Sequence, residues 1–92
     1  MEKPEMIMML RSQICQVLIG EYPSWFFPKT VAEKLNRRFP EEIGFWERVH
    51  RLIVPMTQKQ FEREVAIYAA IKELAKAGIT ITGGHGEIRM AD

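Results

Sequence analysis

Few residues in this 92-residue chain have the type and spacing that catalysis or metal binding requires. The two histidines, His50 and His85, are far apart in sequence, and the single Cys15 has no base near it. Because a nucleophile needs an adjacent base and a metal site needs closely spaced ligands, the sequence predicts no enzyme, no metal centre and no cofactor. We expect Cys15 to be a buried thiol in a reducing compartment.

The glycine-rich segment Gly83-Gly84-His85-Gly86 has some likeness to a phosphate-binding loop. It lacks the Lys-Ser/Thr pair and the following helix that make such a loop specific. Glycines in this arrangement suit the positive backbone angles of a tight β-hairpin. We therefore expect His85 to be an exposed residue at a hairpin tip, with contact to a phosphate or a minor groove as the alternative interpretation.

Charge gives only a local argument for nucleic-acid binding. The net charge is +1, from 13 basic and 12 acidic residues. Segment 29–51 has six basic and four acidic residues. Segment 57–77 has four basic and three acidic residues, and the chain from Gly78 onward has one basic and two acidic residues. Proteins that contact several phosphates usually concentrate Lys and Arg on one face. Any basic footprint must therefore be local, and of these three segments only 29–51 is mildly basic, with a net charge of +2.

Apolar residues recur at helical spacing in four segments, which predicts four helices. The first covers 4–20, with Leu10 and Ile14 on its apolar stripe; the second runs from Pro28 to Pro40; the last runs from 57 to 77. A third helix is plausible between Pro40 and Pro55. Its expected inner row is Ile43, Trp46, Val49 and Ile53, and its expected outward residues are Glu47, Arg48, His50 and Arg51.

The last helix has signals at both ends. Thr57 and Gln60 have the spacing of a capping box, and Gly78 followed by Ile79 is typical of a Schellman ending. Beyond Gly78 the apolar period changes to two, which predicts a hairpin. We expect Ile79 and Ile81 to share its apolar face with Ile88 and Met90.

These elements predict a mainly α fold with a small β-hairpin (α+β), in one domain over 1–92. An apolar content of 47% is sufficient for a packed core. Arg11 and Gln13 interrupt the apolar segment 6–19, so no signal peptide or membrane span is expected. The sequence therefore favours a soluble, cytoplasmic protein.

Two motifs resemble a known family. Phe27-Pro28-Lys29-Thr30-Val31-Ala32-Glu33-Lys34-Leu35 is similar to the second helix of winged helix-turn-helix domains, and Ala70 to Met90 is similar to the end of their recognition helix plus the wing. The resemblance implies double-stranded DNA as partner, with the recognition helix in the major groove. Either 41–54 or 57–77 is the recognition helix. The candidate DNA-binding residues are Lys34, Arg37, Arg38, Gln58, Lys59, Arg63, His85 and Arg89.

Two functions follow from the resemblance. The first is a small DNA-binding regulator of transcription, acting as a homodimer because one small module offers few base contacts. The second is a winged-helix protein–protein interaction module that joins a complex and binds no nucleic acid. Steep salt dependence of DNA affinity would favour the first, and a large exposed apolar patch would favour the second.

Overall fold

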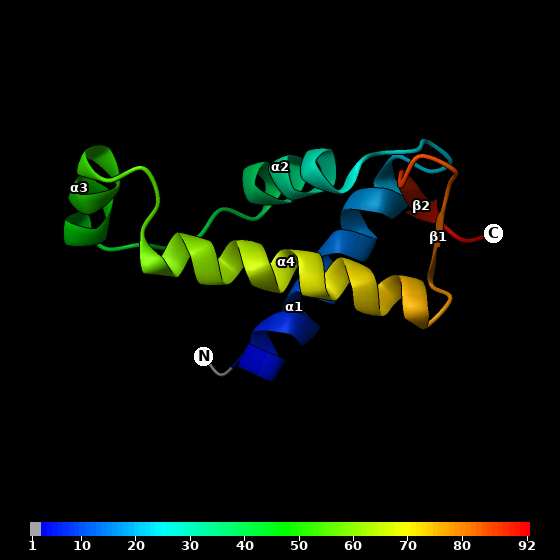
Figure 1. Cartoon of the computed structure of the whole chain (residues 1–92), viewed down its shortest axis with the longest axis horizontal. Coiled ribbons are helices and arrows are strands. Elements are labelled where there is room, and N and C mark those ends of the chain that lie inside the picture. The colour runs from blue at the N-terminus through cyan, green and yellow to red at the C-terminus, as the bar shows by residue number, and fades with distance from the viewer. Residues whose placement is uncertain (1–2) are drawn as a thin grey trace.

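The computed structural model describes residues 3–92 as four helices followed by a two-stranded antiparallel hairpin. The helices are α1 (Lys3–Gly20), α2 (Pro28–Arg38), α3 (Phe45–Ile53) and α4 (Gln58–Lys76), and the strands are β1 (Thr80–Thr82) and β2 (Ile88–Met90). Figure 1 shows α4 crossing α1, with the hairpin at one end of the long axis and α3 at the other. The predicted mainly helical α+β fold is confirmed.

The core lies where α1, α2, the C-terminal part of α4 and the hairpin meet. The largest fully buried side chains come from three helices: Leu10, Ile14 and Leu18 on α1, Val31 and Leu35 on α2, and Ile67 and Leu74 on α4. Burying a side chain of this size contributes roughly 1.5–3 kcal/mol. The apolar stripe predicted for the first helix is therefore confirmed as core.

Both predicted ends of α4 are confirmed. The backbone N–H of Gln60 donates to Thr57 Oγ1 (3.2 Å), and the backbone N–H of Thr57 donates to Gln60 Oε1 (2.9 Å), which completes the capping box. At the other end Gly78 has φ 75°, and the N–H of Ile79 donates to the carbonyl of Leu74 (3.0 Å). This is the Schellman arrangement, which needs a residue that tolerates positive φ.

The hairpin forms as predicted, but the prediction of its apolar face is wrong. The register pairs Thr80 with Met90 and Ile81 with Arg89. Because paired residues point to the same face, Ile81 lies with Arg89 on the outer side, whereas Thr80 is buried. The alternation of apolar residues along each segment gave no information about how the two strands pair, and a shift of one residue exchanges the faces.

A short extended segment between α1 and α2 ties the first half of the chain to the hairpin. Phe26 forms an antiparallel bridge with Ile88, with backbone N···O distances of 2.9 and 2.7 Å. Pro28 then opens α2 as predicted, directly after this bridge. The helices, the bridge and the hairpin are compatible with a winged helix.

Candidate interaction surface

Helix α3 is attached to the rest of the molecule through its polar side. Arg51 lies 3.1 Å from Glu41 and 3.2 Å from Glu47, measured between guanidinium nitrogen and carboxylate oxygen. The hydroxyl of Thr57, the residue before α4, donates to Glu47 Oε1 (2.8 Å). This hydrogen bond, assisted by Arg51, lowers the pKa of Glu47 below its ordinary value. Polar contacts therefore connect α3 to the segments on both sides of it.

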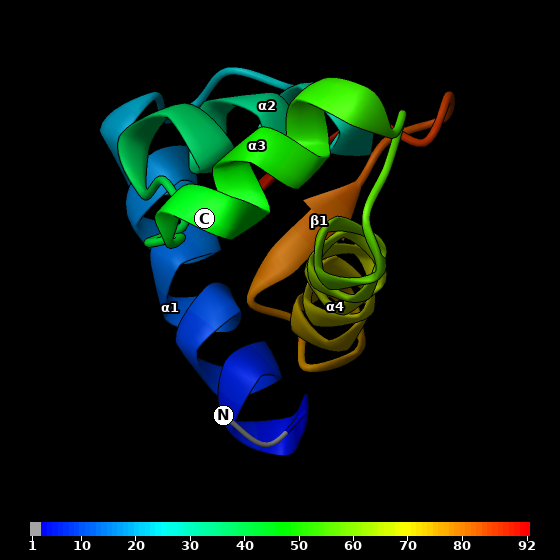
Figure 2. The same ribbon diagram turned by 90° about the vertical axis from the view of Figure 1, so that its left-hand side faces the viewer.

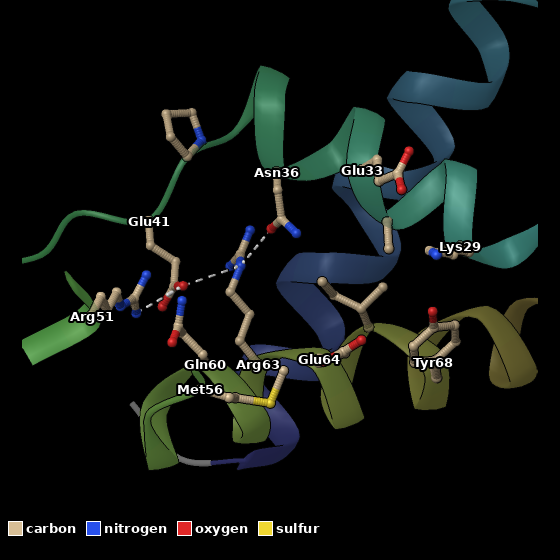
Figure 3. Close-up of a pocket in the computed structure, with 13 residues that line it drawn as sticks. Lys29, Glu33, Asn36, Glu41, Arg51, Met56, Gln60, Arg63, Glu64 and Tyr68 are labelled. Atoms are coloured by element: carbon tan, nitrogen blue, oxygen red, sulfur yellow. Dashed lines mark hydrogen bonds and ion pairs between the residues drawn. The ribbon is translucent and has the colours of Figure 1, made fainter. Parts of the chain in front are cut away.

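Arg63 on α4 continues this polar cluster into the interior. Its Nε donates to Asn36 Oδ1 (2.9 Å) and its Nη2 donates to the Phe39 carbonyl (3.0 Å), while Glu41 lies 3.9 Å away. Figure 3 shows Glu41 between Arg51 and Arg63. Burial lowers the pKa of the Arg63 guanidinium, and the nearby Glu41 partly offsets this. Arg63 thus fixes the chain that leaves α2.

The outward-facing side of α3 is apolar, which contradicts the predicted inner row. The exposed fractions are 68% for Phe45, 80% for Trp46, 84% for Leu52 and 76% for Ile53, and Val49 lies between them on the helix surface. Glu47 and Arg51, predicted to point outward, are instead the half-buried residues that hold α3 to the body. We call Phe45, Trp46, Val49, Leu52 and Ile53 the α3 face.

The position of α3 explains why no other part of residues 3–92 covers this face. Figure 1 shows α3 beyond the end of α2, and Figure 2, which looks at that end, shows it in front of the other helices. Polar contacts on one side of a helix leave the opposite side turned away from the body. The four most exposed side chains carry roughly 600 Å² of accessible surface, at the upper limit for the largest patch of a typical monomer.

A groove of about 530 Å³ lies beside the polar cluster, between α2 and the first half of α4 (Figure 3). Its lining contains three cationic and three acidic side chains: Lys29, Arg51, Arg63, Glu33, Glu41 and Glu64. Equal numbers of opposite charges provide little net attraction for an anionic or a cationic ligand. The groove therefore does not by itself indicate a phosphate or nucleic-acid site.

The predicted DNA-binding residues of α2 differ in their surroundings. Lys34 lies 3.1 Å from Glu21 and over the ring of Phe26. Arg38 donates to the carbonyl of Gln16 (3.1 Å), and Arg37 is exposed. Within the described residues, Arg37 is the one of these three that is exposed and makes no hydrogen bond or ion pair.

The predicted residues of the last helix and hairpin lie in separate places. Gln58 and Lys59 are exposed in the first turn of α4, whereas Arg63 is buried by the contacts above. His85 is exposed at the hairpin tip, as predicted. Arg89 pairs with Asp92 (3.1 Å) and lies 5.0 Å above the ring of Trp25.

The pairing of Arg89 with Asp92 shifts both pKa values. The hydrogen bond from Arg89 lowers the pKa of Asp92, to which the Tyr22 hydroxyl also donates, and the same bond raises the pKa of Arg89. Figure 1 shows the hairpin at the opposite end of α4 from the first turn that carries Lys59. The structure therefore does not gather the eight residues on one surface, and DNA contact by any of them stays a prediction.

Sequence reasoning missed the α3 face as a surface. Its apolar period was recognised, but the same period describes a buried and an exposed stripe equally well. One available signal was the polar pair Glu47 and Arg51, spaced i, i+4, with Thr57 and Glu41 nearby in sequence to bind it. Those partners decide which side of α3 faces the body.

Comparisons with protein-family models, with curated proteins and with solved structures found no match to this chain. Within residues 3–92, no helix is long and apolar enough to cross a bilayer. The same residues contain no group of three His, Cys, Asp or Glu side chains with the geometry to hold a metal ion.

Proposed function

We propose that this protein is a winged-helix-like protein–protein interaction module that contacts its partner through the α3 face. The observation that carries the proposal is the exposure of Phe45, Trp46, Leu52 and Ile53 on one side of a helix. Aromatic and aliphatic residues of this kind form the central anchors of protein interfaces. A partner that covers them gains the hydrophobic free energy that the isolated chain does not.

The local structure supports a surface that is organised before binding. Glu47, Arg51 and Thr57 hold the polar side of α3, so its apolar side is presented in a fixed direction. The rings of Phe45 and Trp46 pack edge to face, with centroids 5.3 Å apart. Because the anchors are already ordered, binding does not have to fix the whole segment, and less conformational entropy is lost.

Photo-crosslinking in cells tests this function. Trp46 is replaced by p-benzoylphenylalanine, and a matched control carries the same replacement at Lys76, an exposed residue near the other end of α4. Irradiation is expected to give protein adducts from position 46 and few or none from position 76. Equal adduct yields from the two positions, or adducts to nucleic acid alone from position 46, would contradict the proposal.

DNA binding by a winged helix-turn-helix is a second candidate, supported by two observations. The order of helices, the bridge of Phe26 to Ile88 and the C-terminal hairpin are compatible with that fold, and Gln58 and Lys59 are exposed at the start of α4. Gln can pair with adenine and Lys neutralises phosphate. In this candidate α4 is the recognition helix and the hairpin is the wing.

Titration with random-sequence duplex DNA at low and at physiological salt tests the second candidate. Neutralising several phosphates requires affinity that falls steeply as salt rises. Lys59→Ala would then weaken binding to all sequences, whereas Lys76→Ala would not. Absence of binding at low salt eliminates this candidate and leaves the interaction module unaffected.

A further inference from the structure

A second apolar strip runs along α4, and its last residue, Tyr68, also lines the groove beside α2. Phe61, Val65 and Tyr68 are spaced i, i+4 and i+7, so they form one row along the helix, and their exposed fractions are 54%, 38% and 38%. The buried residues of α4, such as Ala66 and Ala70, are on the other side of the helix. We call Phe61, Val65 and Tyr68 the α4 stripe.

The two apolar surfaces have complementary polar groups along their borders. On α4, Glu62 and Glu64 lie on either side of the stripe, each within about 100° of its centre on the helix surface. On α3, Arg48 and His50 lie in the same way on either side of the α3 face. If the two surfaces meet, the carboxylates of α4 can accept hydrogen bonds from the guanidinium and imidazole groups of α3, so the borders are complementary.

The two surfaces match in length, although the α4 stripe exposes less area than the α3 face. At 1.5 Å per residue the α3 face is about 12 Å long and the α4 stripe is about 10 Å long. Together their seven most exposed side chains carry roughly 850 Å², close to the ~800 Å² per partner of a standard protein interface. A reciprocal contact, in which each copy supplies both surfaces, would bury at most an area of this size from these side chains on each copy.

The α3 face does not fit its own α4 or a second α3. To reach the α4 of the same chain, α3 would have to lose the Thr57–Glu47 and Arg51–Glu41 contacts that turn its apolar side away. Two α3 helices paired antiparallel about a two-fold axis would bring Arg48 opposite Arg48, which repels. The α4 stripe of another copy has neither disadvantage.

From this complementarity we infer that the partner of the α3 face is a second copy of this chain, and that the protein forms a two-fold dimer in which each α3 docks on the α4 stripe of the other copy. The inference rests on the proposed function, because it names the partner of the same α3 face. Each copy contributes one α3 face and one α4 stripe, so two identical contacts close the dimer.

Sedimentation equilibrium of the purified protein over a wide concentration range is the first test. We expect a monomer–dimer equilibrium, and Leu52→Asp or Val65→Asp is each expected to weaken the dimer at least about tenfold, because each introduces a charge into the apolar contact. The control Lys76→Asp should leave the dissociation constant unchanged. Circular dichroism of each variant confirms that it is folded.

Charge exchange provides the decisive test. One variant carries Arg48→Glu, and the other carries Glu62→Arg and Glu64→Arg. Each alone is expected to dimerise about tenfold more weakly than the parent, because like charges then meet across both contacts. Mixing the two variants should restore dimerisation, since in the mixed dimer every α3 meets an α4 stripe with a border of opposite charge.

A monomer at all concentrations overturns the inference, as does a dimer that is insensitive to the α4 variants. Retention of the wild-type protein on anionic lipid vesicles, lost in Leu52→Asp, would also overturn it by making a membrane surface the occupant of the α3 face. If position 46 gives photo-adducts to other proteins and the purified chain is monomeric, the dimer is refuted but the proposed function is not. If there are neither photo-adducts nor dimers, the proposed function is refuted as well.

Discussion

Helices α2 and α3 are both short and amphipathic, but the fold uses them in opposite ways. Helix α2 buries Val31, Ala32 and Leu35 against α1 and α4, whereas α3 buries no residue. Helix α2 follows directly from the Phe26 bridge to β2, so its apolar side is brought onto the core. Helix α3 is reached through the segment beyond Pro40 and is anchored by charged groups. Amphipathicity therefore establishes a helix but not what its apolar side contacts.

The largest expected effect on stability comes from replacing a leucine with aspartate in α2, compared with the same replacement in α3. Leu35→Asp on α2 buries a charge in a fully enclosed site, and we expect loss of the cooperative melting transition, from a cost above about 4 kcal/mol. Leu52→Asp on α3 is its matched control and should change the unfolding free energy of the monomer by less than about 0.5 kcal/mol. Thermal denaturation at low protein concentration measures both. Similar losses for the two variants would contradict the comparison.

A smaller effect is expected where the polar cluster meets α4. Arg63→Ala leaves Asn36 and the Phe39 carbonyl without their donor and should cost about 1–3 kcal/mol in urea denaturation. Arg37→Ala, on an exposed side of α2, is the control and should remain within about 0.5 kcal/mol of the parent. If both arginines behave alike, the Arg63 contacts do not stabilise the fold.

Thr57 connects α3 to α4, and its removal should have a moderate effect. Thr57→Ala removes the N-cap of α4 and the donor to Glu47, with an expected loss of about 1 kcal/mol. Amides of α3 should also exchange with solvent faster than in the parent, whereas those of α2 should be unchanged. Thr57→Ser keeps the hydroxyl and is expected to retain most of both properties. Equal exchange of α3 in the Ala and Ser variants would show that the hydroxyl does not hold α3.

The smallest effect is an acid sensitivity restricted to α3. The contacts of Glu47 lower its pKa, so their stabilisation is present above the ordinary value of 4.5 and is lost as pH falls through the lowered value. Hydrogen exchange of α3 amides should therefore accelerate at acidic pH, once corrected for the intrinsic pH dependence of exchange. Glu47→Gln should reduce this acceleration. A pH profile of α3 that is identical in the two proteins would exclude Glu47 as its cause.

Much of the fold was predictable because its signals are local. The capping box joins Thr57 to Gln60, and the Schellman ending joins Leu74 to Ile79, so each depends on residues within one or two turns. The α1 stripe was predictable because a helix of this length has one apolar side and the chain has one core. These features required no knowledge of distant contacts.

The sequence by itself determined the first, second and last helices, both ends of the last helix, and the hairpin with its glycine-rich tip. Only the tertiary structure decided that Thr80 rather than Ile81 faces the core, that Arg63 is buried against Asn36, and that the apolar side of α3 faces outward. Each of these depends on a partner in another element: Met90 for the hairpin register, Asn36 for Arg63, and Glu41 and Thr57 for α3. Periodicity gives the spacing of side chains along an element, whereas the direction in which that element faces is fixed by contacts between elements.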